Sequence, residues 1–467
     1  MPASVPTIDK MLQALASRQN ELSRAYRYSS PDPEPHNLAV TIPPALMSLR
    51  ARVAWCQALV FALEERIELK DVTLPGDEEM TTRLRRWIED GDLREAMSEA
   101  HEEALRTGVG YVVVSAHPEL PDTPLFTAES PSSFYAHTDQ RTGRVLWAIR
   151  SYRADPGEPS YSIDGHDRVT VYLPNETRYY VRRGGSWRSD PEIPNVRHNL
   201  GEPPVEALIN RRSRRHPFGV PEHKALWDLQ DAAARTLTSL QIAQEFSALP
   251  QKVILNADPD DFAEDPQDEG SESQPVSQAE LILRRYLVLT GDARIGEYSA
   301  AQLTNYTTAL NALARQASAV SGLPPDFLGL TSDANPASGD AIRGSNDRIV
   351  RRAQRFVRGL TPAWTRIIAK AARAVGYRRD DLARIQVIWA DPGTVTPSAM
   401  ADAVQKLAGI RTANGPLFTR DFLWKYMDVA PEDREAMREE LASSSFADLL
   451  SEFAPDDAEV PSGPSES

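Results

Sequence analysis

The sequence holds a single cysteine, Cys56, and few lysines. One cysteine excludes an internal disulfide and any metal site built from several cysteines, and it is typical of a reducing compartment. Its apolar helical surroundings predict a small buried side chain. Lysine occurs seven times against 45 arginines, and alanine and proline are abundant. This bias indicates a GC-rich source genome.

Long apolar runs are also missing. No stretch approaches the ~18 apolar residues of a membrane-spanning helix, and no apolar run follows a basic start, so we expect a soluble, intracellular protein without a secretory signal. The net charge is −15, which argues against nonspecific attraction of the whole molecule to nucleic acid or to anionic membranes. With 467 residues, 41% of them hydrophobic, the chain is long enough for a globular protein with several cores.

The motifs of nucleotide and nucleophile chemistry are absent from the sequence. There is no Gly-Lys-Ser/Thr for a phosphate-binding loop, no Gly-x-Gly-x-x-Gly after a strand, and no nucleophile elbow. His101 is followed by two glutamates but lacks the second histidine that a zinc-protease helix needs, so we interpret it as a surface helix position. We therefore expect neither an enzyme nor a cofactor.

An acidic run between residues 258 and 272 is the one candidate for metal chemistry. It holds eight carboxylates and no basic residue. Oxygen ligands suit Mg²⁺ or Ca²⁺, but the calcium-loop spacing is missing and nuclease chemistry needs rigidly held carboxylates. We expect a solvated, mobile insertion without a metal site. A metal-dependent nuclease using Asp258, Asp260 and Asp261 stays open as an alternative.

Hydrophobic periodicity predicts an α+β protein that is mostly helical. Helices are expected first, over residues 7–28, 44–69 and 77–107. The period then changes from 3.6 to 2, which predicts an antiparallel sheet laid on those helices. Its strands are expected at 111–116, 133–137, 145–152, 169–173, 178–182 and 205–210.

The second half of the chain reads as helical again. The expected elements, in order, are a helix over 221–248, a strand over 286–290, a helix over 300–320, a long helix after residue 339, a strand over 385–389, and helices over 397–409, 419–427 and 431–450. Residues 321–339 cannot continue a helix, because prolines lack the backbone donor and restrict the residue before them. The last residues are mostly Pro, Ser, Glu and Asp, and we expect a disordered tail there.

The long helix should have one buried and one cationic side. Its apolar residues Ile342, Ile349, Ala353, Phe356, Leu360, Trp364 and Ile367 recur at helical spacing. The basic stripe comprises Arg343, Arg348, Arg351, Arg352, Arg355 and Arg358. Asp347 is within reach of Arg343 and Arg351 at four-residue spacing.

A second basic cluster, at 211–215, joins the last strand to the next helix. We expect it to be a solvated connector or a partner for acids of another subunit, with phosphate contact as the alternative.

In this order, the segments resemble the portal proteins of long-tailed bacteriophages, in the branch common in phages of actinobacteria. The resemblance covers about residues 8–440. It rests on 103–114 (EALRTGVGYVVV), 130–135 (SPSSFY), 170–180 (TVYLPNETRYY), 227–237 (WDLQDAAARTL), 245–251 (EFSALPQ), 320–325 (VSGLPP) and 335–339 (NPASG). Each motif is weak alone, whereas their order and spacing are specific.

The resemblance implies a portal-type fold that assembles as a ring, typically a dodecamer. Its parts would be a wing (1–218), a stem helix (219–248), a clip with the acidic insertion (249–299), a second stem helix (300–321), a tunnel loop (322–339), a long wing helix with a strand (340–392), a crown (393–450) and an acidic tail (451–467). The loop would line the channel with Thr331, Ser332, Asp333, Asn335 and Ser338. The basic stripe would face either a neighbouring subunit or DNA.

The implied function is a structural ring at one capsid vertex through which double-stranded DNA is packaged and ejected. Implied partners are the terminase large subunit and a head-tail adaptor at the clip, and the major capsid protein and scaffold at the wing, with no membrane. The protein would assemble in the host cytoplasm and end in the virion. A helical head-tail adaptor or scaffold without a channel remains the other alternative.

Overall fold

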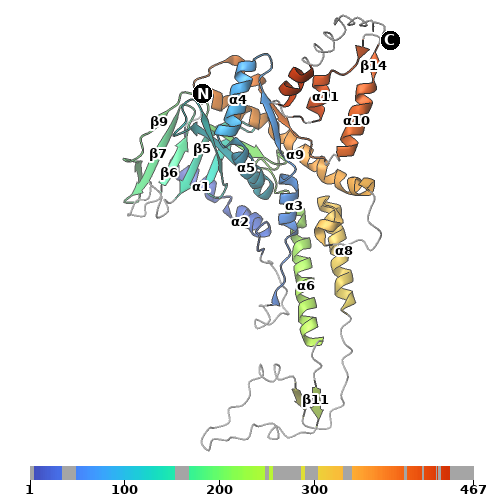
Figure 1. Cartoon of the computed structure of the whole chain (residues 1–467). Helices are drawn as coiled ribbons and strands as arrows, with labels where there is room; N and C mark the ends of the chain where they lie inside the picture. The colour runs from blue at the N-terminus through green and yellow to red at the C-terminus, as the bar shows by residue number, and fades with distance from the viewer. Residues whose placement is uncertain are drawn as a thin grey trace, which may run out of the picture. The chain divides into compact units, whose positions relative to one another are not determined.

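The computed structural model describes two compact units, Met1–Pro392 and Gly393–Ser467 (Figure 1). The residues it describes are 5–33, 49–152, 168–247, 252–255, 286–289, 303–329, 339–393, 397–412, 415–427, 429 and 433–441. In the described part of the first unit, a run of nine successive strands, β2 to β10, stands between mainly helical segments and forms antiparallel sheets, so the expected α+β class is confirmed.

The first expected helix is two helices, α1 (Ile8–Ala16) and α2 (Gln19–Tyr28). The expected helix over 77–107 also divides, into α4 (Glu78–Asp90) and α5 (Leu93–Thr107). The second break has a clear cause at Gly91. A Cβ at this glycine would lie 2.6 Å from the carbonyl oxygen of Pro124, because another strand approaches the backbone there.

The helix expected over 44–69 is shorter than predicted in the structure, at both its start and its end. Helix α3 covers only Trp55–Glu64, residues 50–54 are not helical, and Leu69 begins the strand β1 (Leu69–Thr73). The apolar residue at position 69 fits a helical spacing, yet it pairs with a strand more than 300 residues later in the chain. Tertiary pairing has overridden the local pattern.

A three-stranded antiparallel sheet forms the centre of the first unit, in the order β10 (Val205–Ile209), β2 (Val109–Ala116) and β3 (Pro124–Glu129). Both faces of β2 are covered, which explains its uninterrupted apolar run. Val112 and Val114 face the helical core, while Tyr111 and Val113 face a second sheet. Gly110 permits close contact with α5, because a Cβ there would lie 2.2 Å from the carbonyl oxygen of Ala100.

The second sheet has six antiparallel strands, at the left of Figure 1. They are β4 (Phe134–Thr138), β5 (Val145–Tyr152), β6 (Arg168–Tyr172), β7 (Glu176–Arg183), β8 (Ser186–Ser189) and β9 (Val196–Arg197). Its outer face packs against α1 through Met11 and Leu15. The first unit is therefore layered as helices, three-stranded sheet, six-stranded sheet and α1.

Two long helices, α6 (Trp227–Ser247) and α8 (Thr304–Ser321), lie side by side (Figure 1). The last turns of α8 also contact the 3₁₀ turn η2 (Lys224–Leu226) at the start of α6, so the two helices run antiparallel. Between them, β11 (Lys252–Leu255) and β12 (Tyr286–Leu289) pair in parallel. The sequence patterns predicted both helices and β12 but not β11.

Helix α9 (Gly339–Ala374) is the longest element, at 36 residues, and continues through Pro362. The expected buried stripe is confirmed from Ile349 to Ile367, all of it at most 3% exposed. His101, expected on the surface, is buried against this stripe: its Nε2 accepts a hydrogen bond of 2.8 Å from the indole N–H of Trp364. Burial lowers the pKa of His101 to about 3, so the ring is neutral.

The chain then forms the 3₁₀ segment η5 (Asp380–Arg384) and β13 (Gln386–Trp389), which pairs antiparallel with β1. The second unit contains α10 (Pro397–Gly409), a small hairpin of β14 (Arg411–Thr412) and β15 (Gly415–Pro416), α11 (Arg420–Tyr426), and helical residues 433–441. Cys56 is fully buried in the core of the first unit, as its surroundings predicted.

Candidate functional site

A buried carboxylate, Glu222, marks the point where the chain enters α6. It follows Pro221 and stands two residues before η2. Its backbone N–H donates to the carbonyl of Leu105 (2.9 Å), in the last turn of α5. The side chain is only 1% exposed. This residue therefore sits where the layered part of the unit meets the pair of long helices.

Four side chains converge on the carboxylate of Glu222. Arg211, two residues after the end of β10, donates to both oxygens, with Nη2 at 2.5 Å from Oε1 and Nε at 2.6 Å from Oε2. Arg352 of α9 reaches Oε1 at 2.9 Å, and Arg355, one turn later, reaches Oε2 at 3.3 Å. The amide of Asn210 donates to Oε2 at 3.0 Å. One buried acid thus joins the end of β10 and the entrance of α6 to α9, which lies 130 residues later.

The charges of this cluster settle its protonation state. Burial alone would raise the pKa of Glu222, but hydrogen bonds and charge from Arg211, together with Asn210 and Arg355, outweigh burial and hold its pKa below the ordinary value. The carboxylate is therefore ionised at neutral pH, and arginine keeps its proton in proteins. We call these five residues, Asn210, Arg211, Glu222, Arg352 and Arg355, the Glu222 junction.

The junction also anchors the end of α8. Arg352 Nη2 donates to the carbonyl of Val320 (2.6 Å), in the last turn of that helix. Gly322 then ends α8 with φ of +77°, a left-handed conformation that favours glycine. Leu323 is buried before the 3₁₀ turn η4 (Pro325–Leu328), and Leu328 is buried as the last residue of that turn. The chain is consequently held in place up to the start of the segment 330–338.

A second buried carboxylate fixes the other half of α9. Glu206 of β10 accepts from Arg366 through Nε (3.1 Å) and Nη2 (3.0 Å), and Lys370 Nζ lies 2.9 Å from its Oε1. Lys370 is itself buried and donates to the carbonyl of Val205 (2.7 Å). Helix α9 is therefore attached to the central sheet at one point and to the entrance of α6 at another.

The basic stripe predicted on α9 divides into different roles. Arg352 and Arg355 belong to the Glu222 junction within the chain. Arg351 is 75% exposed and pairs with Asp347 at 3.0 Å, as the four-residue spacing predicted. The side chains of Arg348 and Arg358 are exposed, and the stem of Arg348 passes close to Gly322. The side chain of Arg343 lies outside the described residues.

The predicted cluster at 211–215 is also used inside the chain. Arg211 belongs to the junction, and Arg212 donates to the carbonyls of Asp139 (3.3 Å) and Gln140 (3.4 Å). All five residues are nevertheless exposed and lie outside helices and strands, as expected of a solvated connector. Sequence reasoning missed Glu222 altogether, because its basic partners lie 11, 130 and 133 residues away and no local spacing relates them.

The five predicted loop residues, Thr331, Ser332, Asp333, Asn335 and Ser338, lie outside the described residues, as does the acidic run 258–272. Among the residues that the structure does describe, no group of three or more His, Cys, Asp or Glu is arranged to hold a metal ion. Within the same residues, every helix is too short or too polar to cross a bilayer.

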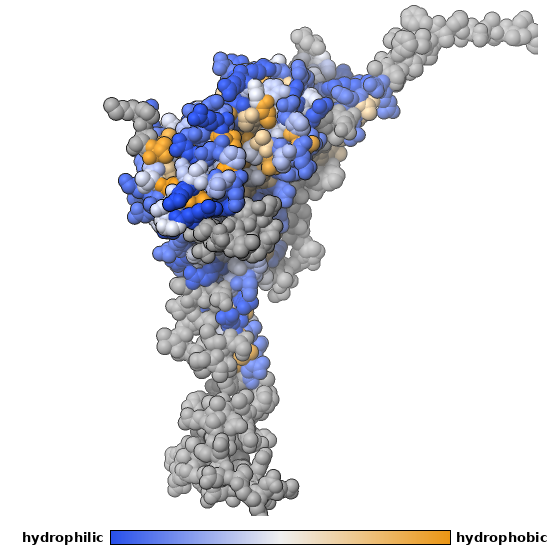
Figure 2. All heavy atoms as spheres, turned by 90° about the vertical axis from the view of Figure 1, so that its left-hand side faces the viewer, coloured by the Kyte–Doolittle hydropathy of each residue, from blue (hydrophilic) through white to orange (hydrophobic). Residues whose placement is uncertain are grey.

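Helix α8 has an exposed face that is almost free of charge. Of its 18 residues only Arg315 is charged, while a quarter of the whole chain is charged. The other exposed side chains are small or polar, such as Thr308, Asn311 and Ala312. By contrast, the sheet face in Figure 2 is mostly hydrophilic, with apolar residues scattered over it. The uncharged face of α8 is typical of a surface that packs against another helix or lines a passage.

Comparison with known proteins gives a family match over most of the chain. The model of the family described as phage portal protein, SPP1 Gp6-like, matches residues 22–415. The portal protein of Mycobacterium phage D29 is 31% identical over 98% of this chain and 93% of its own length. The portal protein of Mycobacterium phage L5 is 29% identical over the same shares.

Solved structures give a more distant likeness. A chain from the neck of a native gene transfer agent particle, computed with C12 symmetry, aligns with 84% of this chain and 91% of its own, with 15% identity and a TM-score of 0.38. A chain from the virion of a native gene transfer agent particle aligns over 88% and 99%, with 14% identity and a TM-score of 0.41.

Proposed function

Because the chain belongs to the family of phage portal proteins of the SPP1 Gp6-like type, we propose that twelve copies of it form a ring around a DNA channel at one capsid vertex. Its role as a portal protein of the virion is structural and not enzymatic. In the ring, 1–218 and 340–392 form the wing, and α6 and α8 form the stem. Residues 249–299 form the clip, 322–339 the tunnel loop and 393–450 the crown.

The observation that carries this proposal is the antiparallel pair α6 and α8 together with the Glu222 junction at one end of it. The pair supplies a stem whose α8 face has a single charge. The junction holds the entry of the tunnel loop against the wing helix α9. A force that DNA exerts on the loop would thus pass through Arg352 into both wing and stem.

The negative net charge of the chain supports a channel that binds DNA only weakly. Twelve copies at −15 each carry a net charge of −180, so the ring as a whole repels a polyanion. The short polar side chains at 331–338 can form and lose phosphate contacts without holding the duplex. Arg351 and Arg358 of the stripe are then better suited to an acidic face of the adjacent copy than to DNA.

The remaining parts of the proposal concern partners. The clip binds the terminase large subunit during packaging and the head-tail adaptor afterwards, and the wing contacts scaffold and major capsid protein. Assembly takes place in the host cytoplasm. No observation favours a second function, since the acids of the nuclease alternative lie outside the described residues.

Electron microscopy of the purified chain tests the ring directly. We expect class averages with a central hole; only monomers and dimers, at high concentration and with scaffold present, would refute it. Deleting 331–338 tests the loop separately. Rings should still form while DNA packaging fails, whereas loss of the rings would show that these residues hold subunits together.

A further inference from the structure

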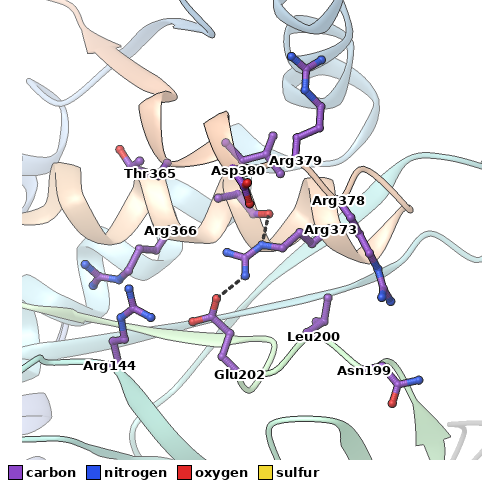
Figure 3. Close-up of a pocket in the computed structure, with 13 residues that line it drawn as sticks. Arg144, Asn199, Leu200, Glu202, Thr365, Arg366, Arg373, Arg378, Arg379 and Asp380 are labelled. Carbon is purple, nitrogen blue, oxygen red and sulfur yellow. Dashed lines mark hydrogen bonds and ion pairs between the residues drawn. The ribbon is translucent and has the colours of Figure 1, made fainter.

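A cleft on the first unit is lined by five arginines (Figure 3). It lies between the C-terminal half of α9, the segment 199–202 and η5. Its volume is about 510 Å³, within the range of about 300–1,000 Å³ that is usual for ligand sites. The lining also holds two carboxylates, Glu202 and Asp380, so positive charge predominates there although the whole chain has a net charge of −15.

Two of the arginines are held in place and still have N–H groups to offer. Arg366 donates to the buried Glu206 through Nε (3.1 Å) and Nη2 (3.0 Å). Arg373 donates through Nε to the carbonyl of Ala369 (3.2 Å), and its Nη1 lies 2.8 Å from Glu202. Neither Nη1 of Arg366 nor Nη2 of Arg373 donates a hydrogen bond to any described residue. This wall of the cleft is therefore preorganised, which lowers the cost of ordering it around a ligand.

Two further arginines of the cleft have no acidic partner. Arg144, just before β5, and Arg378, two residues before η5, are exposed, and within the described part of the chain neither guanidinium has an ion pair or a hydrogen bond. By contrast, Arg379 points away from the cleft and pairs with Asp77 and Asp381. Arg144 and Arg378 are thus cationic groups left for a ligand.

The placement of the guanidinium groups suits an elongated anion. Figure 3 shows Arg144 extending toward Arg366 at one end of the cleft, Arg378 at the other end, and Arg373 between them. Cations that line one cleft repel one another, and an anion among them removes this cost. A single anionic group would contact one end only, whereas linked anionic groups contact both ends and gain from their linkage.

The chemistry of these side chains favours phosphate. Guanidinium groups only donate, and their planar forks match phosphate oxygens in pairs. A terminal phosphate offers three acceptor oxygens and up to about two negative charges, so a short phosphate chain can accept from all the spare N–H groups. Glu202 does not oppose such a ligand, because its charge is already paired with Arg373 and, at 3.6 Å, with the buried Lys370.

A DNA duplex fits this cleft less well. Its phosphates follow a long, regular line along the outside of a rigid helix. The arginines of the cleft instead line one isolated hollow, in a protein whose net charge repels a long polyanion. A small, flexible anion avoids both difficulties.

We propose that the cleft binds a short chain of linked phosphates, either inorganic or carried by a nucleotide, through Arg144, Arg366, Arg373 and Arg378. The bound anion joins the turn between β4 and β5, which carries Arg144, to α9 and to the segment before η5. It therefore stabilises the place where these three segments meet. This proposal is independent of the ring, because every residue in it belongs to one copy.

Calorimetric titration of the purified full chain with inorganic triphosphate, at constant ionic strength, tests the site. We expect one saturable site per chain, with an affinity about tenfold lower in R144E/R378E. The matched control R141E/R384E carries the same charge change on exposed arginines that do not line the cleft, and it should bind like the wild type. The absence of saturable binding up to about 1 mM would overturn the proposal, as would an equal loss in both variants.

Other anions in the same titration define the ligand. Orthophosphate should bind about tenfold more weakly than triphosphate, because it reaches one end of the cleft only. ATP that binds as tightly as triphosphate would identify the phosphate chain as the ligand, and tighter binding of ATP would identify a nucleotide; both results support the proposal. Citrate that binds as tightly as triphosphate would contradict the choice of phosphate. A DNA duplex that displaces triphosphate and requires Arg144 and Arg378 would overturn the small ligand.

Hydrogen exchange in the full chain locates the bound anion. With triphosphate at about 100 times its dissociation constant, amides at 199–202 and 378–383 should exchange up to about 100-fold more slowly, because opening must first release the ligand. R144E/R378E should lose this protection at the same triphosphate concentration, while both substituted residues are exposed and their change leaves the core intact. Protection confined to other segments would place the anion elsewhere and refute the site.

Discussion

Replacing Glu222 with glutamine is the sharpest test of the Glu222 junction, where the layered part of the first unit meets the pair of long helices. Glutamine has nearly the same volume and keeps one acceptor oxygen, but it removes the negative charge. Arg211, Arg352 and Arg355 then face one another without a counter-charge. Because the acid joins the end of β10, the entrance of α6 and α9, the effect should appear where these segments meet.

The solvent exposure of the three arginines determines how much stability E222Q should lose. Removing one partner of a fully buried ion pair costs about 3–5 kcal/mol. Arg352 is only 19% exposed, but Arg211 and Arg355 are 37% and 44% exposed, so water solvates part of their charge. Glutamine also retains some hydrogen bonds. We therefore expect E222Q to lose about 2–3 kcal/mol of local stability at neutral pH.

Native-state hydrogen exchange is the suitable assay, because a protein of several units need not unfold in one step. Amides at 220–226 and 318–323 should exchange about 30–150-fold faster in E222Q, which is the same free energy expressed as a rate ratio. The matched control is Glu99→Gln, since Glu99 is exposed on α5; it should change stability by less than about 0.5 kcal/mol. Unchanged exchange at both segments in E222Q would refute the reasoning.

The direction of the pKa shift provides a second signature. The folded-state pKa of Glu222 is lowered, so its contribution is present above the unfolded value of about 4.3 and is lost as the pH falls through the folded value. The difference between wild type and E222Q should therefore be constant near neutral pH and disappear in acid. A difference that persists after acidification would show that packing, and not charge, is responsible.

Other consequences follow from single contacts. His101 has a pKa of about 3 in the folded state, so only the unfolded state takes up a proton as the pH falls from 6.5 to 5. The free energy of unfolding, measured with urea, should therefore fall by about 2 kcal/mol over this range, and H101Q should make it less dependent on pH. Gly322→Ala should lower the free energy of unfolding by about 1–2 kcal/mol in the same measurement, because alanine is strained at positive φ. Gly329→Ala should lower it less, since Gly329 also has positive φ but only a Cβ at 322 would crowd Arg348. Phe422 and Tyr426 stack in a row on α11 and are 44% and 46% exposed, so F422A/Y426A should reduce the fraction of rings seen by electron microscopy without unfolding the monomer.

The elements that sequence patterns predicted well are those whose signal is local. The stripe of α9 repeats over five turns, and four of the six strands in the second sheet, β4 to β7, lie at the positions that the sequence predicted, whereas β8 and β9 were not predicted. The errors share the opposite property. Strand β1 pairs with β13 across more than 300 residues, and α4 ends where β3 approaches Gly91. In each case a distant segment decides between conformations that the local sequence permits.

The candidate site shows the same limit in electrostatic form. Periodicity placed Arg352 and Arg355 on the cationic side of α9, and that placement is right. A periodic pattern does not predict which arginines will be partly buried and paired with an acid. That depends on Glu222, which stands alone in its own segment. Once it is buried, it draws in the nearest guanidinium groups, because an ionised carboxylate without partners is too costly in the interior. The stripe is consequently divided: Arg352 and Arg355 bind the carboxylate at the entrance of α6, Arg352 also binds the end of α8, and Arg348, Arg351 and Arg358 stay exposed. Among the described members of the stripe, these exposed arginines are available for a neighbouring copy. Charge reversal at Arg351 and Arg358 should therefore affect assembly, whereas loss of Arg352 should affect the fold of the monomer first.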